Sequence, residues 1–542
     1  MAKMKERNAQ LKNALGAMAP KERIVEANNL PQYDAKNRQG FGAYAVADEL
    51  RLIAMLNTLK LEPQAYRTEN ETMKELRDLI EKIGMKDPYF VAQAIAWSRN
   101  QGEGMRSINH LAAALLAPFA SGEEWAKRFY SLYNKTTKSG GCIYRPDDMQ
   151  EIKDVYAALN QGTLSNAMRK GFADAIEHLD TYLLAKYKDA VINVANLSHP
   201  NSKLSTAEIM VNGKKMKTLD ALMQGITVSA DTWEVAQAEA GQEVAKAVKA
   251  GVLDAKEAEA VLAEAKNNNW EDLLKEGKLG ILAALRNIRN MLKNPRHEVI
   301  AMLAALLSNG ELIRKGKIMP YQIDTAYEIV KEEFSGAYAE TIKAALIKGY
   351  ELSVPNLAEA LPGKTCVFLD CSGSMWTSCM NGRSRMSATA CEKAGLIAAT
   401  IAKATGADVV RFGSNAQMAS YNPQKNVFEL GKELANSNMG CTSISAAFEL
   451  IRQRHLKYDR IIILSDNECN RGTTYGSYKS YIHDVCSPYI YAVDLAVYGT
   501  IPVKNEGKVN YYFGFGYTFF DDIASREFNP AAHINKVRKY VI

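Results

Sequence analysis

Oxygen-bearing side chains stand at the ends of two apolar runs in the last third of the chain. Asp370 ends the run TCVFLD and is followed by Ser372 and Ser374. Asp466 ends RIIILSD, and Thr442 stands in GCTSIS just ahead of a predicted helix. Because the carboxyl ends of parallel strands meet at one edge of a sheet, we expect these side chains to lie close together. Carboxylates and hydroxyls without a set of His or thiolate ligands suit a hard cation, best Mg²⁺ or Mn²⁺.

Two other uses of these residues are open from the sequence. Asp370 and Asp466 could instead cap loops and helix N-termini. Ser372 or Ser374 could be a nucleophile, but CSGSM is not a G-x-S-x-G elbow and only His483 is a candidate base. We therefore expect a binding site and not an enzyme.

The residues around this site alternate between short β-rich runs and helical runs. TCVFLD, ADVVRFG, RIIILSD, YIYAVDLAV and NYYFGFG are predicted strands, SATACEKAGLIAATIAKATG and TSISAAFELIRQRH are predicted helices, and AAHINKVRKYVI is a predicted last helix. Strand and helix in alternation predict a doubly wound α/β domain with a parallel sheet. We place this domain at residues 361–542.

Residues 1–360 have a different period. From about residue 45 to 355 apolar residues recur every three or four positions, as in ADELRLIAMLNTLK and YFVAQAIAWSRN, with short connections. No run of alternating β-branched residues is long enough to indicate a sheet. The pattern predicts an all-α array of HEAT-like repeats.

Basic residues gather in one part of the helical array. Arg286, Arg289, Lys293 and Arg296 are spaced three or four apart, which predicts one stripe on a helix and on the turn beyond it. Such a stripe can follow a phosphate backbone, although a solvated helix face would have the same pattern. An acidic, helix-prone insertion at residues 235–266 precedes it.

Composition limits the class of protein without selecting a partner. The 542 residues carry 67 basic and 61 acidic side chains, and this balance of +6 neither demands nor excludes nucleic acid. The eight cysteines form no CxxC pair, so we expect reduced thiols. Neither a signal peptide nor an apolar run of about 18 residues is present. We expect a cytoplasmic protein with no membrane contact.

Several segments together resemble the Ro autoantigen family, in which a TROVE ring precedes a von Willebrand factor A domain. NRQGFGAYAVADELRLIAML resembles the opening motif of that family, and AMRKGFADAIEHLDTYLLAKYKDAVINVANLSHPNSK, WEDLLKEGKLGILAALRNIRNML and GKIMPYQIDTAY have counterparts in the same order. The sequence DCSGS with Thr442 and Asp466 resembles the metal-ion-dependent adhesion site (MIDAS) of von Willebrand factor A domains.

The resemblance implies an RNA-binding protein. Its ring of helical repeats would take the single-stranded 3′ ends of misfolded or unassembled noncoding RNA, and its outer surface would bind small Y-like RNAs, in RNA quality control or stabilisation. Arg169 and Lys170 fall on an Arg-Lys pair of the family, His199 falls on a histidine tied to Y RNA, and Arg106 falls in a comparable basic loop. We expect a monomer, because one chain would close the ring. The sequence does not decide whether RNA tethers an exoribonuclease to it.

The resemblance has gaps, and other interpretations stay open. TLKLEPQAYRTENE stands where the family has a glycine-rich run, and the acidic insertion has no obvious counterpart. His199 could simply hydrogen-bond in a turn, and Trp97 and Tyr321 could belong to the core. A protein-interaction scaffold that depends on the metal, with incidental RNA binding, is the alternative function.

Overall fold

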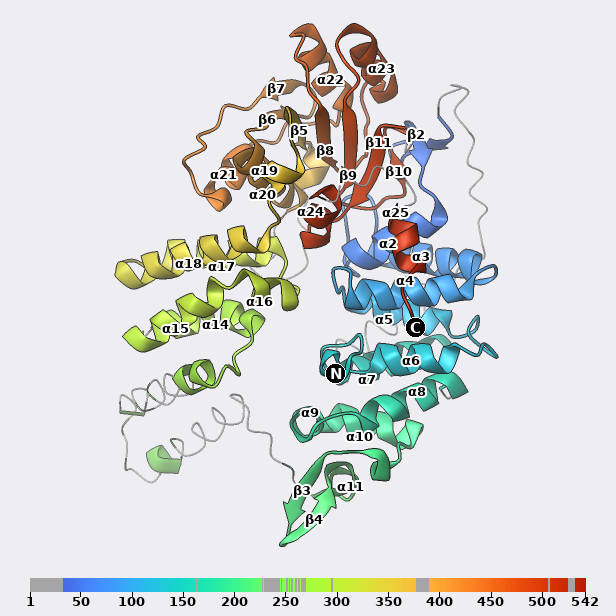
Figure 1. The fold of residues 1–542 in the computed structure, drawn as a ribbon, viewed down its shortest axis with the longest axis vertical. Coiled ribbons are helices and arrows are strands. Elements are labelled where there is room, and N and C mark those ends of the chain that lie inside the picture. Colours follow the sequence, from blue (N-terminus) through green and yellow to red (C-terminus); the bar gives the residue numbers. More distant parts are fainter. Residues whose placement is uncertain are drawn as a thin grey trace.

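A six-stranded sheet lies above two arms of helices (Figure 1). The computed structural model describes residues 33–160, 164–226, 270–293, 296–376, 389–504, 507–524 and 532–542, with isolated positions between 228 and 264. The predicted acidic insertion therefore falls largely outside the described residues.

The sheet has the strand order β11-β9-β8-β5-β6-β7. All neighbouring strands run parallel except β7, which pairs antiparallel with β6. The strands are β5 (Thr365–Asp370), β6 (Asp408–Phe412), β7 (Ala416–Met418), β8 (Arg460–Ser465), β9 (Tyr489–Asp494) and β11 (Val509–Phe513). Every residue of β5 and β8 is buried, as expected for central strands covered on both faces.

Helices cover both faces of this sheet. They are α20 (Ala390–Thr405), α21 (Val427–Leu434), α22 (Ile444–Gln453), α23 (Thr474–Asp484) and α24 (Tyr517–Ala524). Alternate residues of β5 point to opposite faces: the Phe368 ring packs 5.1 Å from that of Phe448 in α22, whereas Val367 belongs to the apolar cluster that contains Ile397 of α20. The doubly wound α/β domain predicted from the sequence is confirmed.

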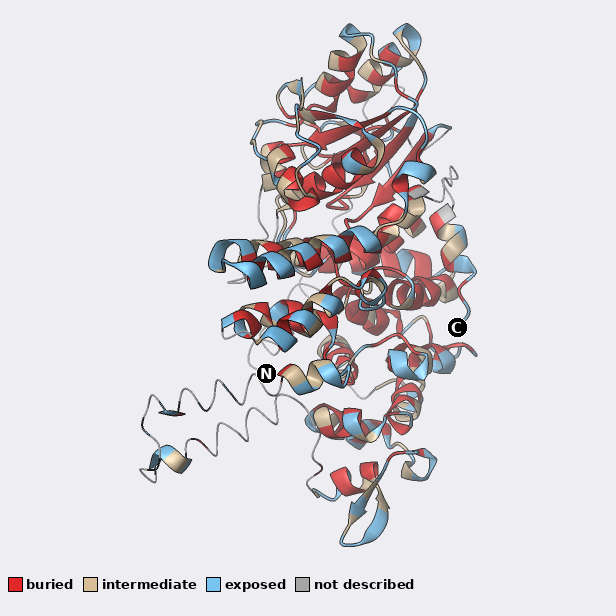
Figure 2. Ribbon diagram, turned by 60° about the vertical axis from the view of Figure 1, so that its left-hand side comes forward, coloured by how far each residue is buried: buried red, intermediate tan, exposed pale blue. Residues whose placement is uncertain are grey.

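The first arm consists of consecutive helices joined by short turns. These are α2 (Asp48–Thr58), α3 (Glu69–Gly84), α4 (Pro88–Asn100), α5 (Ser107–Leu116), α6 (Ala126–Asn134), α7 (Asp147–Asn160), α8 (Asn166–Glu177), α9 (Thr181–Lys186), α10 (Lys188–Ser198) and α11 (Thr218–Met223), with short 3₁₀ turns at Thr137–Ser139 and Ser202–Leu204. Buried residues lie on the faces that stack against neighbouring helices, while the outer faces are exposed (Figure 2). This arrangement is the predicted helical repeat.

The second arm rises back to the sheet on the other side (Figure 1). It contains α14 (Ile281–Lys293), α15 (His297–Leu307), α16 (Gly310–Lys315), α17 (Pro320–Glu333), α18 (Ala337–Ser353) and α19 (Leu357–Ala360). The final helix of the chain, α25 (Ala532–Arg538), returns to the first arm, where the Gln93 amide of α4 donates to the carbonyl oxygens of Arg538 and Tyr540 at 2.9 and 2.7 Å. Both ends of the sheet domain are thus tied to helices.

The helical part also contains short strands, which the sequence pattern did not indicate. Two short antiparallel pairs occur there, β1 (Ala35–Lys36) with β2 (Gly42–Ala45) and β3 (Glu208–Val211) with β4 (Lys214–Lys217), and β10 (Thr500–Ile501) of the sheet domain adds to β2. Strands of two to four residues are too short to show a period. The β3–β4 turn has φ of 50° at Asn212 and 76° at Gly213, the Asn-Gly geometry that marks a tight hairpin.

Polar contacts dock the second arm on the sheet domain. The Asn426 amide donates to the Tyr327 hydroxyl of α17 at 2.9 Å, that hydroxyl donates to the Glu429 carboxylate of α21 at 3.2 Å, and Lys432 pairs with Glu328 at 2.7 Å. Aromatic packing between Tyr327 and Phe428, with ring centroids 5.1 Å apart, adds apolar contact. The arm and the domain therefore form a mixed polar and apolar interface.

The carboxyl group of Asp324 in α17 lies in this interface, where its ionised form is unfavourable. This predicts a pH-dependent effect of Asp324→Asn on the stability of the fold. Burial raises the pKa of Asp324 to about 7, although Lys432 opposes the shift. A carboxyl group whose pKa is higher in the folded chain contributes stability at low pH that is lost as pH rises from about 4 to about 7. We expect Asp324→Asn to raise the thermal unfolding midpoint by about 2 °C at pH 8 and by less at pH 5.

The exposed Asp78 of α3 supplies the matched control, since Asp78→Asn should leave both midpoints unchanged. Equal shifts at the two pH values for Asp324→Asn would contradict this account of the interface.

Candidate functional site

The two predicted metal-site aspartates meet at the carboxyl edge of the sheet. β5 and β8 are neighbours in parallel register, with Leu369 opposite Leu464, so Asp370 and Asp466 leave the sheet side by side. The Ser465 hydroxyl donates to Asp370 Oδ2 at 2.5 Å, and the Ser372 N–H donates to Asp370 Oδ1 at 2.8 Å. Both hydrogen bonds fix the orientation of the Asp370 carboxylate.

The serines and Thr442 complete an oxygen-lined edge. The hydroxyl oxygens of Ser372 and Ser374 lie 3.3 Å apart, and the Ser374 hydroxyl is hydrogen-bonded to the Asp466 carboxylate. The Gly373 N–H donates to the Gly440 carbonyl at 2.8 Å. This hydrogen bond holds the loop that carries Thr442 against the loop that follows β5. The structure thus brings the loops that carry all five predicted metal-site residues to one edge of the sheet.

Buried carboxyl groups are concentrated at this edge. Burial raises the pKa of Asp370 to about 7, and the charge of Asp466 adds to the shift. Burial also raises the pKa values of Asp466, of Glu468 to about 8 and of Asp494 to about 6. A cation bound among these groups would stabilise their ionised forms.

The donor set fits a hard divalent cation. The predicted donors are the carboxylates of Asp370 and Asp466 and the hydroxyls of Ser372, Ser374 and Thr442, and the buried Glu468, which the Arg38 backbone contacts, adds a further negative charge nearby. Oxygen donors of this kind suit Mg²⁺ better than a soft metal. Binding of a metal by these residues stays a prediction.

Sequence reasoning missed two polar residues beside the predicted metal site, Asp494 and Asn470. Asp494 ends β9, and its carboxylate accepts from the N–H groups of Ala496 and Val497 at 2.9 and 2.7 Å and from the Tyr511 hydroxyl at 2.9 Å. The Asn470 side chain accepts from the Thr442 N–H at 2.9 Å. An aspartate at the end of a third predicted strand was a signal for Asp494, whereas Asn470 has no such signal.

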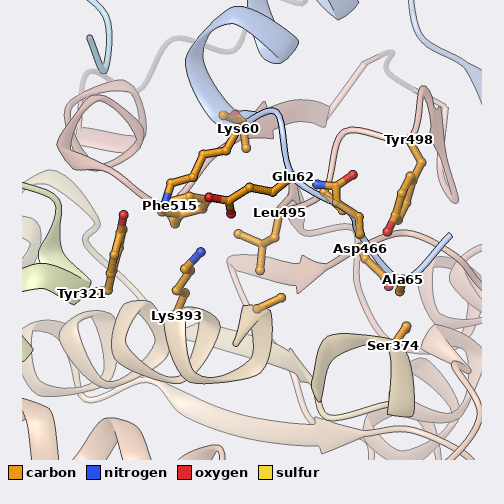
Figure 3. Close-up of a pocket in the computed structure, with 14 residues that line it drawn as sticks. Lys60, Glu62, Ala65, Tyr321, Ser374, Lys393, Asp466, Leu495, Tyr498 and Phe515 are labelled. Atoms are coloured by element: carbon orange, nitrogen blue, oxygen red, sulfur yellow. The ribbon is translucent and has the colours of Figure 1, made fainter. Parts of the chain in front are cut away.

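The segment that joins α2 to α3 covers this edge of the sheet. The hydroxyl of Tyr66 is hydrogen-bonded to Ser374, and its N–H donates to the Tyr498 hydroxyl at 3.3 Å. The buried Arg67 guanidinium donates to the carbonyl oxygens of Ala496 and Val497 at 2.8 and 2.9 Å. This segment contains most of TLKLEPQAYRTENE, and it covers the predicted metal site, which lies next to the cavity in Figure 3.

A second group that could hold a metal ion lies within the first arm. His110, Asp148 and Glu151 are buried, and their ligand atoms all lie within 4.8 Å of one another. The Arg99 guanidinium is 3.1 Å from Asp148, and that of Arg106 is 3.2 Å from Glu151 and also pairs with Asp148. Two guanidinium groups already balance these carboxylates, so the same cluster also serves as an ion-pair network.

This network engages one of the predicted RNA-binding residues. The Arg106 side chain keeps 38% of its surface exposed, and it also lies 3.4 Å from Asp147. RNA would have to compete with three carboxylates for this guanidinium group.

The Arg169, Lys170 and His199 side chains lie on neighbouring helices. Arg169 is half-buried and Lys170 is exposed in the first turn and a half of α8, and the exposed His199 ends α10 with a left-handed φ of 53°. The Glu177 carboxylate at the end of α8 accepts from the Asn201 N–H at 2.6 Å. His199 therefore lies near the end of α8 and the Arg-Lys pair near its beginning, about 12 Å away along the helix axis.

The predicted basic stripe follows α14. Arg286 and Lys293 are exposed, opposite the apolar face that faces the core. Arg289 forms a bidentate ion pair with Glu333, and Arg296, at the N-cap of α15, lies 3.3 Å from Glu271. Carboxylates of the same chain thus engage half of the stripe.

Trp97 and Tyr321 belong to the core, as one interpretation of the sequence held. Trp97 is 7% exposed and Tyr321 is 5% exposed. His483, the only candidate base, lies in the last turn of α23, where its Nδ1 is 2.7 Å from the Asp484 carboxylate.

A solved structure resembles almost the whole chain. It is the crystal structure of the Deinococcus radiodurans Ro (RSR) protein, with 13% sequence identity and a TM-score of 0.54, and the match covers 90% of this chain and 100% of that chain. The protein has the Ro fold. The predicted fold class, helical repeats followed by a von Willebrand factor A-like domain, is therefore confirmed. No protein-family model and no curated protein matches the sequence.

The Ro fold carries an oxygen-lined sheet edge in this chain, which leads to a prediction about Mg²⁺. At pH 8 we expect saturating MgCl₂ to raise the thermal unfolding midpoint of the wild-type protein by about 2 °C, because a ligand that binds only the folded state stabilises it. Asp370→Asn and Asp466→Asn should abolish this rise.

His110→Gln is the control that separates the two candidate centres. This variant should keep the rise of the unfolding midpoint with MgCl₂. If His110→Gln lost that rise and Asp466→Asn kept it, the result would contradict the sheet-edge site and assign the metal to the first arm.

Proposed function

We propose that this protein is a bacterial Ro-like protein that binds noncoding RNA. The likeness to the Deinococcus Ro protein over 90% of the chain is the observation that carries the proposal. The described surface adds support, because exposed basic side chains occur on both arms. No helix among the described residues is long and apolar enough to cross a membrane.

The helical arms would bind the single-stranded 3′ ends of misfolded or unassembled RNA. Arg286 and Lys293 form no ion pair with the described residues and are exposed on α14, so the guanidinium and the ammonium group are both available to phosphates. Arg289 and Arg296 would exchange a carboxylate for a phosphate. Contacts with the backbone alone bind many sequences and weaken steeply with salt, which suits quality control or stabilisation of varied RNAs.

The surface of α8 and α10 would bind a small structured RNA of the Y-like class. Lys170 and His199 are exposed, and their separation along α8 spans more than one phosphate. Recognition of a folded RNA by its shape and phosphates needs such an extended surface.

The sheet edge would hold Mg²⁺ and join the two parts of the molecule without catalysing a reaction. Asp370, Ser372, Ser374, Thr442 and Asp466 would provide or support its ligands. Because Tyr66 is hydrogen-bonded to Ser374, the metal would face the α2–α3 segment and not an external partner. This contact favours RNA binding over the alternative of a metal-dependent protein scaffold.

The proposal includes an intracellular context. We infer a monomer, because one chain supplies both arms and the sheet domain. We place it in the cytoplasm. RNA bound on the outer surface could tether an exoribonuclease.

The affinity for a hairpin RNA with a single-stranded 3′ tail tests this function. We expect the tailed RNA to bind more tightly than the same hairpin trimmed flush, and Arg286→Glu/Lys293→Glu to lower the affinity for the tailed RNA about tenfold at moderate salt. Fluorescence anisotropy titrations measure both.

Lys457→Glu is the matched charge control. Lys457 is an exposed lysine just before β8, at the opposite end of that strand from Asp466, and its reversal should leave the affinity unchanged. Equal, weak binding of tailed and flush RNA by the wild-type protein would overturn the proposed function.

A further inference from the structure

A small cavity lies where both arms meet the carboxyl edge of the sheet. Its volume is about 70 Å³, and residues from the α2–α3 segment, α17, α20 and the loops after β9 and β11 line it. Ser374 and Asp466 lie at one side of it and Lys393 and Tyr321 at the other (Figure 3). A cavity of this size holds several waters or one compact polyatomic ion.

Two lysines reach one side of this cavity from different elements. The Lys60 ammonium lies 5.4 Å from the centre of the Tyr321 ring, and the Lys393 ammonium lies 4.9 Å from the same ring and 4.1 Å from that of Phe515. Ammonium groups at these distances are attracted to the faces of the rings. Lys60, after α2, and Lys393, on α20, are therefore held beside one pair of aromatic rings.

The rings themselves are fixed. Tyr321 is 5% exposed and Phe515 is 8% exposed, and their centroids are 5.7 Å apart in an edge-to-face arrangement. Because each ring packs against the other, no base can stack between them. The aromatic pair therefore holds the two lysine ammonium groups in place. Because these groups are positively charged, this part of the cavity favours an anion as its ligand.

An anionic side chain of the same chain already extends into this space. Glu62 follows Lys60 in the α2–α3 segment, it is exposed, and its carboxylate points toward the side of the cavity where Lys60 and Lys393 lie (Figure 3). A carboxylate placed there partly neutralises the two ammonium groups. An anion that enters the cavity must displace it.

We propose that Lys60 and Lys393 bind a phosphate group of single-stranded RNA and that Glu62 competes with that phosphate. This inference rests on the proposed RNA-binding function and adds a specific subsite to it. A phosphate is compact, fits the cavity and carries the negative charge that two ammonium groups balance. The cavity also lies between the two arms, where an RNA end held by both arms would pass.

The binding of a fluorescein-labelled oligouridylate of ten nucleotides tests the subsite. Titrations of the full-length protein run in EDTA, so that no metal contributes, at several salt concentrations. We expect Lys60→Ala/Lys393→Ala to bind about tenfold more weakly and to reduce the slope of log affinity against log salt by about 0.7 for each phosphate that the variant no longer neutralises. Glu62→Gln should bind about threefold more tightly, because a competing charge is gone.

The controls separate this subsite from the proposed function. Lys457→Ala should bind as the wild type does. If the double variant does not fold, the affinity of the single variant Lys60→Ala tests the subsite instead, because Lys60 lies on an exposed segment. Unchanged affinity and salt slope in the lysine variants, with normal binding by the wild type, would overturn the subsite and leave the proposed function intact. Failure of the wild type to bind would overturn both. A ten-residue glutamate peptide measured in parallel must not bind in a lysine-dependent manner, since that outcome would assign the cavity to an acidic protein segment.

Discussion

The buried guanidinium of Arg67 joins the helical part of the molecule to the sheet domain. Its side chain has no exposed surface, and it pairs with Glu75 of α3 at 3.0 Å while donating to the carbonyl oxygens of Ala496 and Val497 after β9. Removing such a charge from water is costly unless all of its donors are used. Burial lowers the pKa of Arg67, and Glu75, held ionised by three arginines despite its own burial, opposes that effect. The arrangement works only when helix and sheet are both in place.

Other features of the junction depend on this placement. Once Arg67 fixes the α2–α3 segment, Tyr66 reaches Ser374 and the cavity with Lys60 is formed. A second tie lies close by: the buried Glu103 after α4 accepts from the Thr518 N–H of α24 at 2.9 Å, and the Lys317 ammonium of the second arm donates to the carbonyl of neighbouring Gly102. A Cβ at Gly516 would lie 1.9 Å from the Glu103 carboxylate, so any other residue there would displace the end of that side chain. The carboxyl edge of the sheet is therefore covered by the α2–α3 segment of the same chain.

The sequence predicted those features that follow from local patterns. Strand ends placed Asp370 and Asp466 at one edge, because register in a parallel sheet fixes where each strand ends. Three residues of the basic stripe, Arg286, Arg289 and Lys293, lie on α14, since helical spacing decides which residues share a face, and Arg296 follows at the N-cap of α15. By contrast, the contacts of Tyr66 and Arg67 join residues more than 300 positions apart, and no local period encodes them. The carboxylates that engage Arg289 and Arg296 escaped prediction for the same reason, because helix packing brings Glu333 and Glu271 to them.

The most direct test of the account is to map where the end of a bound RNA tail lies. A hairpin RNA with 4-thiouridine at its 3′ terminus can be crosslinked to the protein by ultraviolet light, and the crosslinked peptides can be identified by mass spectrometry. The account predicts crosslinks in residues 59–67 and in the first turns of α20, where the two arms meet the sheet edge. Crosslinks confined to α8 and α10, with none at the junction, would contradict it.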